Sequence, residues 1–437
     1  MRAPLHFPLR TPLVGRRAFL GGAAATAAAL AMPGRARAES VAPADRRFLF
    51  VYTMGGWDVT RVFAPLFGSP SVSMEPDAAV STVGNVPYVD HPARPSVRAF
   101  FETWYDRVAV VNGIHISSIS HSSAARMITT GTPDASVADW PSRLAAARAE
   151  AHVVPYLVVG GPNFSGRHGV HVGHAGAAGQ LQGIADGSIL ANNDIPVLAP
   201  IAADSDRVDA WLQESARRAG ATYPGAASKG LHTTFGIALD KAMQLKGMVD
   251  DVDLDRGTTF ADQVTLAARV LRLGIARCVA VAHPKPEVNV LWDTHSQNDS
   301  GQSELFEDFF AEMNALMEVL ETTPGAQAAT LADETIVVVL SEMGRTPYVN
   351  GTGGKDHWPY TSALVLGPGV RGNQVIGGYD AGQYGYDIDP VTGAAVASGA
   401  GGSAIGPNVL GATLMVLGDV DPLAEDLVDE PIAALLE

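Results

Sequence analysis

The sequence predicts an α/β protein built on a mostly parallel sheet, and three features of the 437-residue chain support this fold class. Continuous apolar runs of strand length recur along the chain, as expected for parallel strands that are buried on both faces. Amphipathic helical segments alternate with these runs in the second half of the chain. Carboxylates, imidazoles and hydroxyls follow the ends of several runs, which is where parallel sheets carry their sites.

The expected strands are apolar runs that end at a turn or at a polar residue. The first is closed by Gly55-Gly56, and the full set lies at 48–52, 107–115, 152–161, 277–282 and 335–340. Helices with a period near 3.6 residues are expected at 260–273 and 303–323. From about 160 to 234 turn residues are frequent and no clean period appears, so we expect an insertion or cap over the sheet there.

The first 38 residues have the three parts of an export signal. Arg16-Arg17 precede an alanine-rich apolar stretch, and Ala36-Arg37-Ala38 forms a small-residue cleavage site. The apolar stretch is shorter than the roughly 20 residues that span a bilayer. We therefore expect a twin-arginine signal at 1–38 and a mature domain at 39–437. The protein would then pass through the twin-arginine export machinery and be periplasmic or secreted.

Charge and cysteine content exclude several classes of protein. The formal charge is -16 and becomes -22 without the six arginines of residues 1–38. Because so acidic a surface repels phosphate backbones, no nucleic acid partner is expected. Because Cys278 is the single cysteine, the chain can form neither an intrachain disulfide nor a thiolate metal cluster. No later segment reaches membrane-spanning length without charges, so no stable membrane span is expected in the mature chain.

Carboxylates and imidazoles gather after the predicted strands, and together they suit a metal site. The candidate ligands are Asp58, Asp293, His295, Glu342, Asp356 and His357. Oxygen and imidazole ligands hold divalent ions. The prediction is for one or two ions, and each ion is Zn, Mn, Mg or Ca. Each residue alone is more often a cap or a turn residue, so the prediction depends on the whole set. Asp356 is alternatively a partner that orients the imidazole of His357.

Five motifs in combination resemble a known family. They are GGWD, SHSSAARMITTG, WDTHSQN, VVVLSEMGRTP and GGKDHW followed by LVLGPGVRGNQVIGGYD. The combination resembles the bacterial, twin-arginine-exported domain of unknown function 1501 family, which is similar to the alkaline phosphatase and sulfatase superfamily. The resemblance implies a three-layer, alkaline phosphatase-like α/β sandwich. It also implies a metal-dependent hydrolase of phosphate or sulfate esters, whether these are small molecules or carried on polymers.

The resemblance implies metal-binding roles as well. Residues at positions that match superfamily ligands are Asp58, Asp293, His295, Glu342 and His357. Met343 stands where a further ligand is expected, so one ligand of a second metal is missing. Near the position of the superfamily nucleophile the chain has His121, with Ser120 and Ser122 on either side.

Three roles remain open for this segment. Ser120 or Ser122 attacks the ester, His121 attacks it, or His121 is a metal ligand or acid-base group, and the last is favoured. Arg345 contacts an anionic substrate, orients the carboxylate of Glu342, or forms a structural salt bridge. Because the nucleophile is displaced and Met343 replaces a ligand, a second hypothesis is a non-catalytic extracellular or periplasmic binding or structural protein with a remnant metal site.

Overall fold

The computed structural model describes residues 41–176, 181–182, 202–222, 225–248, 252, 254, 259–284, 291–397 and 401–437. The expected signal at 1–38 lies outside these residues and stays a prediction, as does the extent of the insertion expected at 160–234. Among the described residues, no helix is both long enough and apolar enough to cross a bilayer.

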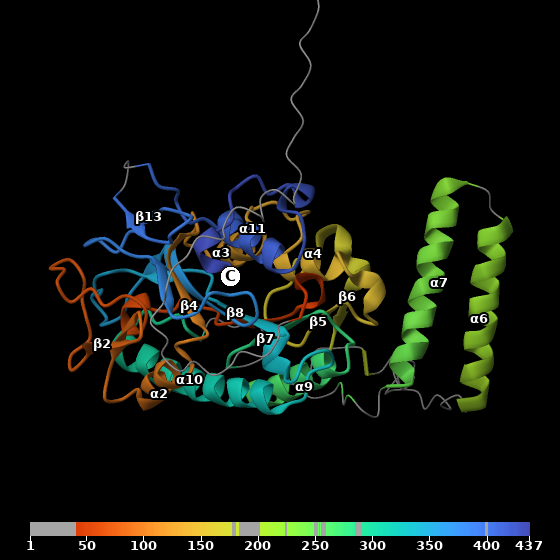
Figure 1. Ribbon diagram of the computed structural model, residues 1–437, viewed down its shortest axis with the longest axis horizontal. Coiled ribbons are helices and arrows are strands. Elements are labelled where there is room, and N and C mark those ends of the chain that lie inside the picture. The colour runs from red at the N-terminus through yellow and green to blue at the C-terminus, as the bar shows by residue number, and fades with distance from the viewer. Residues whose placement is uncertain are drawn as a thin grey trace, which may run out of the picture. The chain divides into compact units, whose positions relative to one another are not determined.

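An eight-stranded sheet forms the centre of the described fold (Figure 1). In spatial order its strands are β12 (Gln374–Gly377), β4 (Val108–His115), β11 (Tyr360–Leu366), β8 (Thr335–Leu340), β1 (Arg47–Tyr52), β7 (Cys278–Ala282), β5 (Tyr156–Val158) and β6 (Val172–His174). β11 is antiparallel to both of its neighbours, and every other neighbouring pair in this sheet is parallel. The predicted fold class, an α/β protein with a mostly parallel sheet, is confirmed.

Helices and short ribbons complete the described fold. The helices are α2 (Pro95–Trp104), α3 (His121–Thr130), α4 (Trp140–Ala146), α6 (Ala202–Thr222), α7 (Ala226–Lys246), α9 (Phe260–Arg272), α10 (Asn298–Thr322) and α11 (Pro407–Leu417). Two-stranded ribbons pair β2 (Ala79–Val83) with β3 (Val86–Asp90), β9 (Gly344–Arg345) with β10 (His357–Trp358), and β13 (Asp387–Ile388) with β14 (Ala395–Val396). Single turns of 3₁₀ helix include η2 (Val59–Arg61), which follows β1.

The central strands are buried on both faces, because helices cover the sheet on each side (Figure 1). On β1, Leu49 and Val51 belong to the core shared with α2, α9 and α10. Phe48 and Phe50, which alternate with them, belong to the core shared with α3, α4 and α11. Every residue of β1 and of β8 is buried, which explains why both strands read as continuous apolar runs.

The expected elements are found, but three differ in extent. β5 covers only Tyr156–Val158 of the run predicted at 152–161. α10 begins at Asn298, five residues before the predicted start, because the buried residues near its start, Asn298 and Gln302, are polar and apolar periodicity does not reveal them. Residues 202–222, within the segment where the sequence shows no clean helical period, form α6. Most of its described side chains are exposed, so no buried apolar face marks it in the sequence.

Candidate metal centre

The candidate site lies where the carboxyl ends of three strands meet. Because β4, β7 and β8 run in the same direction, these ends share one edge of the sheet. His121 is the first residue of α3, which follows β4, and Glu342 comes two residues after β8. Asp293 and His295 precede α10, which follows β7. Segments far apart in the chain therefore supply the site.

The glycine-rich segment after β8 returns the chain to this edge. β9 and β10 pair antiparallel, which places His357 opposite Arg345. In the connecting loop, a Cβ atom on Gly354 would lie 2.0 Å from backbone atoms of His295. Only glycine permits this close approach, which holds the loop against the segment that carries His295.

Four side chains of metal-ligating type converge here. Nε2 of His295 and Nε2 of His357 are 3.0 Å apart, and each lies 3.1 Å from Oδ1 of Asp293. Nε2 of His121 lies 3.3 Å from Oδ2 of Asp293. The ligand-type atoms of His121, Asp293 and His357 all lie within 4.8 Å of one another. Three imidazole nitrogens thus surround one carboxylate.

Each of these imidazoles is held at Nδ1 by an oxygen atom. The pairs and their Nδ1 to oxygen distances are His121 with Glu342 (2.7 Å), His295 with Asp356 (2.8 Å), and His357 with the backbone carbonyl of Ile119 (2.6 Å). Carboxylate and carbonyl oxygens accept hydrogen bonds, so in each neutral ring Nδ1 carries the proton and Nε2 presents a lone pair. Such an oxygen partner on the far nitrogen is the usual support of a metal-binding histidine.

The donor set fits a divalent cation. Three imidazole Nε2 atoms and one carboxylate lie around a common region, and each Nε2 has a lone pair when the Nδ1 of its ring is protonated. Nε2 of His121 is a buried atom with no hydrogen-bond partner among the residues that the structure describes. A cation would interact favourably with all four groups, whereas without one their lone pairs face each other.

The electrostatics of the cluster also favour positive charge. The hydrogen bond with Glu342 raises the pKa of His121, against the opposing effect of burial. Burial disfavours charge on Asp293, but Arg345 and the neighbouring imidazoles outweigh it and keep the pKa of Asp293 below its ordinary value. Asp293 is therefore ionised at neutral pH and is available as an anionic ligand.

Glu342, predicted as a ligand, lies behind His121. Both of its carboxylate oxygens accept from the backbone N–H of Gly55, at 2.8 and 3.1 Å, and the hydroxyl of Ser341 donates to Oε2 at 3.3 Å. Gly55 has a φ of +122°, and a Cβ there would lie 2.7 Å from the backbone of Asp293. The buried Glu342 carboxylate therefore orients the His121 imidazole. Asp356 orients an imidazole in the same way, but that imidazole belongs to His295 and not to His357, its predicted partner.

Arg345 supports Asp293 and not Glu342. Its guanidinium donates to Oδ1 of Asp293 at 2.6 Å and to the backbone carbonyls of Gly56, at 2.8 Å, and Lys355, at 3.1 Å. The side chain is fully buried and contacts no open surface. Of the roles predicted for Arg345, the structure shows a buried salt bridge, which it forms with Asp293.

Asp58, predicted as a ligand, is not brought into the cluster, and its carboxylate is engaged by other side chains. Oδ2 of Asp58 lies 2.8 Å from Nζ of Lys355 and accepts from Nδ2 of Asn298 at 2.8 Å, while Oδ1 accepts from the N–H and hydroxyl of Thr60. Burial alone would raise the pKa of Asp58, but Lys355 and Arg61 outweigh it and hold that pKa far below its usual range. Asp58 is one half of an internal ion pair.

The serines beside His121 lie on the surface at the start of α3. Ser120 and Ser122 are exposed, and within the described part of the chain neither hydroxyl makes a hydrogen bond. A serine and histidine outside the predicted set do meet: Oγ of Ser117 lies 3.5 Å from Nδ1 of His115. The sequence contained a signal for this pair, since His115 ends a predicted strand and Ser117 begins the serine-rich segment 117–123.

The fold and the cluster define an α/β protein with a candidate metal centre at the carboxyl edge of a mostly parallel sheet. The chain belongs to the family described as "Protein of unknown function (DUF1501)", whose model matches residues 96–398. The predicted membership of the domain of unknown function 1501 family is therefore confirmed. No curated protein matches the chain.

Solved structures with similar folds belong to the superfamily that the motifs resemble. A protein in the alkaline phosphatase superfamily from Vibrio parahaemolyticus is 8% identical, with 86% of this chain and 67% of that chain covered and a TM-score of 0.36. A sulfatase from Pseudoalteromonas sp. is 12% identical, with 90% and 72% covered and a TM-score of 0.37. A phosphonate monoester hydrolase from Silicibacter pomeroyi is 10% identical, with 88% and 77% covered and a TM-score of 0.34. Similarity this distant carries no inference about activity, which has to come from the residues of this chain.

Proposed function

We propose that this protein is an exported, metal-dependent hydrolase of phosphate or sulfate esters, with its metal held by His121, Asp293, His295 and His357. The observation that carries the proposal is the convergence of three imidazole Nε2 atoms on Asp293, with each ring anchored at Nδ1. Side chains arranged in this way serve a metal better than they serve packing, because their lone pairs repel one another without a cation.

The nitrogen-rich donor set favours Zn or Mn over Mg or Ca, because the latter two prefer oxygen ligands. A single metal is also favoured over two. Asp58, which the sequence offered to a metal site, is occupied by Lys355 and Asn298. Met343 is buried in the core next to Glu342 and brings no nitrogen or oxygen donor.

A bound divalent ion supplies a Lewis acid that polarises an ester and neutralises its developing charge. The chain's own residues bind and orient: Arg345 fixes Asp293, and Glu342 fixes His121. His295 is half-exposed, so a substrate can reach the cluster from solvent. Lys355 and Arg345 are buried and form ion pairs with Asp58 and Asp293, so neither side chain can neutralise an anionic ester. The bound metal ion would have to do so.

Metal analysis and an ester panel test the proposal. Protein purified without chelators should contain about one Zn or Mn per chain, and it should hydrolyse 4-nitrophenyl phosphate, 4-nitrophenyl sulfate or bis(4-nitrophenyl) phosphate. His357→Ala and His295→Ala should lose both metal and turnover, whereas His171→Ala, a histidine elsewhere in the fold, should keep both. Wild-type protein without metal, or turnover that survives in His357→Ala, would contradict the assignment.

A second candidate is a non-catalytic binding or structural protein with the same metal site. The exposed serines beside His121 make no hydrogen bond to a base within the described residues, which favours this alternative. Stoichiometric metal together with no turnover of any ester in the panel would support it. Export is a separate part of the proposal, and it predicts that a chain with both Arg16 and Arg17 replaced by Lys stays in the cytoplasm.

A further inference from the structure

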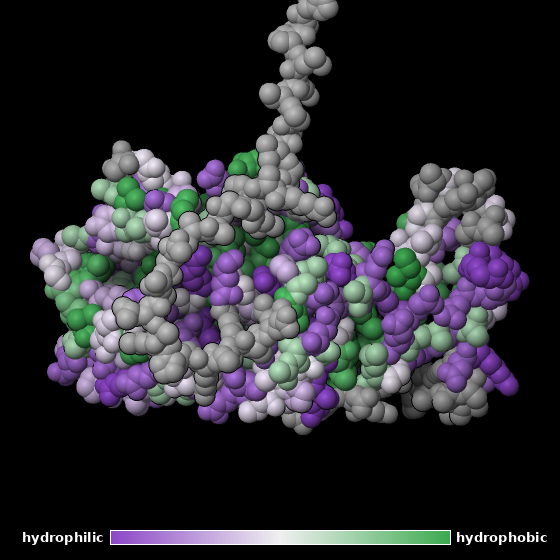
Figure 2. Space-filling view, in the orientation of Figure 1, coloured by the Kyte–Doolittle hydropathy of each residue, from purple (hydrophilic) through white to green (hydrophobic). Residues whose placement is uncertain are grey.

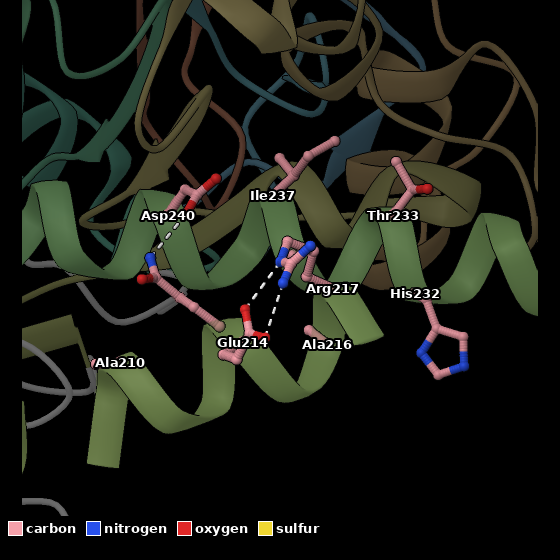
Figure 3. A pocket seen from close by; sticks show the side chains of 10 residues that line it. Ala210, Glu214, Ala216, Arg217, His232, Thr233, Ile237 and Asp240 are labelled. Carbon is pink, nitrogen blue, oxygen red and sulfur yellow. Dashed lines mark hydrogen bonds and ion pairs between the residues drawn. The ribbon is translucent and has the colours of Figure 1, made fainter. Parts of the chain in front are cut away.

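The helices α6 and α7 form a hairpin that has little core of its own (Figure 1). An open hollow of about 720 Å³ lies between them, and the small residues Ala210 and Gly236 are among those that line it. Figure 3 shows a polar contact between the two helices at Asp240, which accepts a hydrogen bond from the side chain of Gln213 at 2.9 Å. Two helices joined in this way bury too little apolar surface to account for the pairing by themselves.

Large apolar side chains of this hairpin face solvent. Trp211 of α6 is 63% exposed and Val208 is 54% exposed, and Leu231 and Phe235 of α7 are exposed as well. Figure 2 shows hydrophobic and hydrophilic residues side by side on the visible face of the hairpin. Exposed apolar residues that cluster on one element mark an interaction surface more often than isolated ones do.

Five residues of α6, all exposed except the partly buried Ser215, follow the spacing of a helix-pairing seam. Intervals of four, three, four and three residues connect Asp204, Val208, Trp211, Ser215 and Arg218. This alternation of three and four is the heptad pattern by which one helix packs along another. The seam has tryptophan at its centre, an acid at its first position and a base at its last.

The two ends of the seam are complementary to each other when the seam is reversed about Trp211. Asp204 lies seven residues before Trp211, and Arg218 lies seven residues after it. We propose that α6 pairs antiparallel with α6 of a second copy of this chain, about a two-fold axis at Trp211. Asp204 of each copy then faces Arg218 of the other, and the two tryptophans meet at the axis, as an isologous interface requires.

Charge also favours a second copy as the occupant. Residues 202–248 contain five acidic and six basic residues, so this segment is nearly neutral in a chain of charge -16. Two copies would repel each other over most of their surface and least at the hairpin. An anionic membrane is a poorer partner, because Asp204, Asp206 and Asp209 lie on the first half of α6 and membrane-surface helices carry lysine and arginine there.

Sedimentation equilibrium of the purified full chain tests this dimer. Wild-type protein should have the mass of two chains, and Trp211→Ser should weaken the dimer by about tenfold or more in dissociation constant. Val428→Ser, at a residue that is 82% exposed elsewhere in the fold, is the matched control and should leave the dimer unchanged. Far-ultraviolet circular dichroism and metal content establish that each variant is folded.

Charge reversal tests the antiparallel register. Asp204→Arg alone and Arg218→Asp alone should each weaken the dimer, because each places like charges opposite one another at both ends of the seam. The double variant restores opposite charges and should recover the dimer. A monomer at every concentration, a dimer that is indifferent to Trp211→Ser, or a double variant no better than the single ones would each overturn the proposal. So would a monomer that binds vesicles of anionic phospholipid.

Discussion

Replacing Lys355 by methionine should destabilise the fold without lowering the metal content. Nζ of Lys355 lies 2.8 Å from Oδ2 of Asp58 and donates to the hydroxyl of Thr60 at 3.1 Å. The side chains of Lys355 and Asp58 are both fully buried. The substitution removes one of the two buried cations that contact Asp58 and leaves Arg61 as the other. The residues of the cluster, His121, Asp293, His295 and His357, keep their partners.

The expected loss follows from the cost of a buried carboxylate that loses the nearer of its two cations, because Nε of Arg61 stays 3.4 Å from Oδ2 of Asp58. Removing one partner of a buried ion pair costs about 3–5 kcal/mol. Asn298 and Thr60 still donate to Asp58 in the variant, so we expect the lower end of that range, about 3 kcal/mol. This is a large part of the roughly 5–15 kcal/mol that stabilises a typical protein. Because Asp58→Asn with Lys355→Met removes both charges of this pair, and Arg61 keeps Asp299 as its partner, the double variant should recover most of the loss.

Urea unfolding of chelator-treated protein measures the free energy of unfolding, and elemental analysis measures the metal. A loss below about 1 kcal/mol in Lys355→Met would refute the reasoning, since ordinary substitutions cost that much. A second refuting result would be an Asp58→Asn variant that loses metal while its stability is unchanged. That outcome would return Asp58 to the ligand set.

Four further predictions concern pH, the support of the imidazoles, the loop and the serines. Because the pKa of Asp58 is held below its unfolded value of 3.8, its contribution to stability is present above pH 4 and is lost as pH falls toward the folded pKa. The urea midpoint of the wild type should therefore fall more steeply with acid than that of the Asp58→Asn, Lys355→Met double variant. Glu342→Gln should weaken metal affinity by about 10–100-fold in competition with a chelating dye, whereas Glu304→Gln, on the exposed face of α10, should not. Gly354→Ala should lose metal, because its Cβ would meet the backbone of His295, while Gly351→Ala, where a Cβ meets nothing within 4 Å, should retain it. Ser120→Ala and Ser122→Ala should retain ester turnover, and abolished turnover in either would identify that serine as the nucleophile.

Apolar runs predicted the central strands well because helices cover both faces of the sheet. β1 and β8 are buried at every position, so nearly the whole strand is apolar and its limits are visible in the sequence. The direction of β11 could not be predicted in this way, since an antiparallel strand in the middle of the sheet is equally apolar. α6 was missed for the opposite reason: its apolar residues lie on an exposed seam and do not mark a buried face.

The positions of chemically reactive residues at strand ends were predictable, but their partners were not. The sheet edge brings His295 and His357 together because both follow strands that end there. The anchors of the rings come from elsewhere: the carbonyl of Ile119 holds His357, and a backbone carbonyl leaves no trace in a sequence. Similarly, no pattern separates Glu342, which supports an imidazole, from Asp293, which lies among the Nε2 atoms.

Asp58 shows most clearly why such a set has to be resolved in three dimensions. A carboxylate after a buried strand and a Gly-Gly turn satisfies every local requirement of a metal ligand, and Glu342 has nearly the same setting. What separates the two is the partner that the fold delivers: the ammonium of Lys355 reaches Asp58, and the imidazole of His121 reaches Glu342. A buried carboxylate next to a lysine is already neutralised, whereas one next to a neutral imidazole still raises the basicity of that ring. The same residue type at the same kind of position therefore stabilises the fold in one case and supports the candidate metal centre in the other.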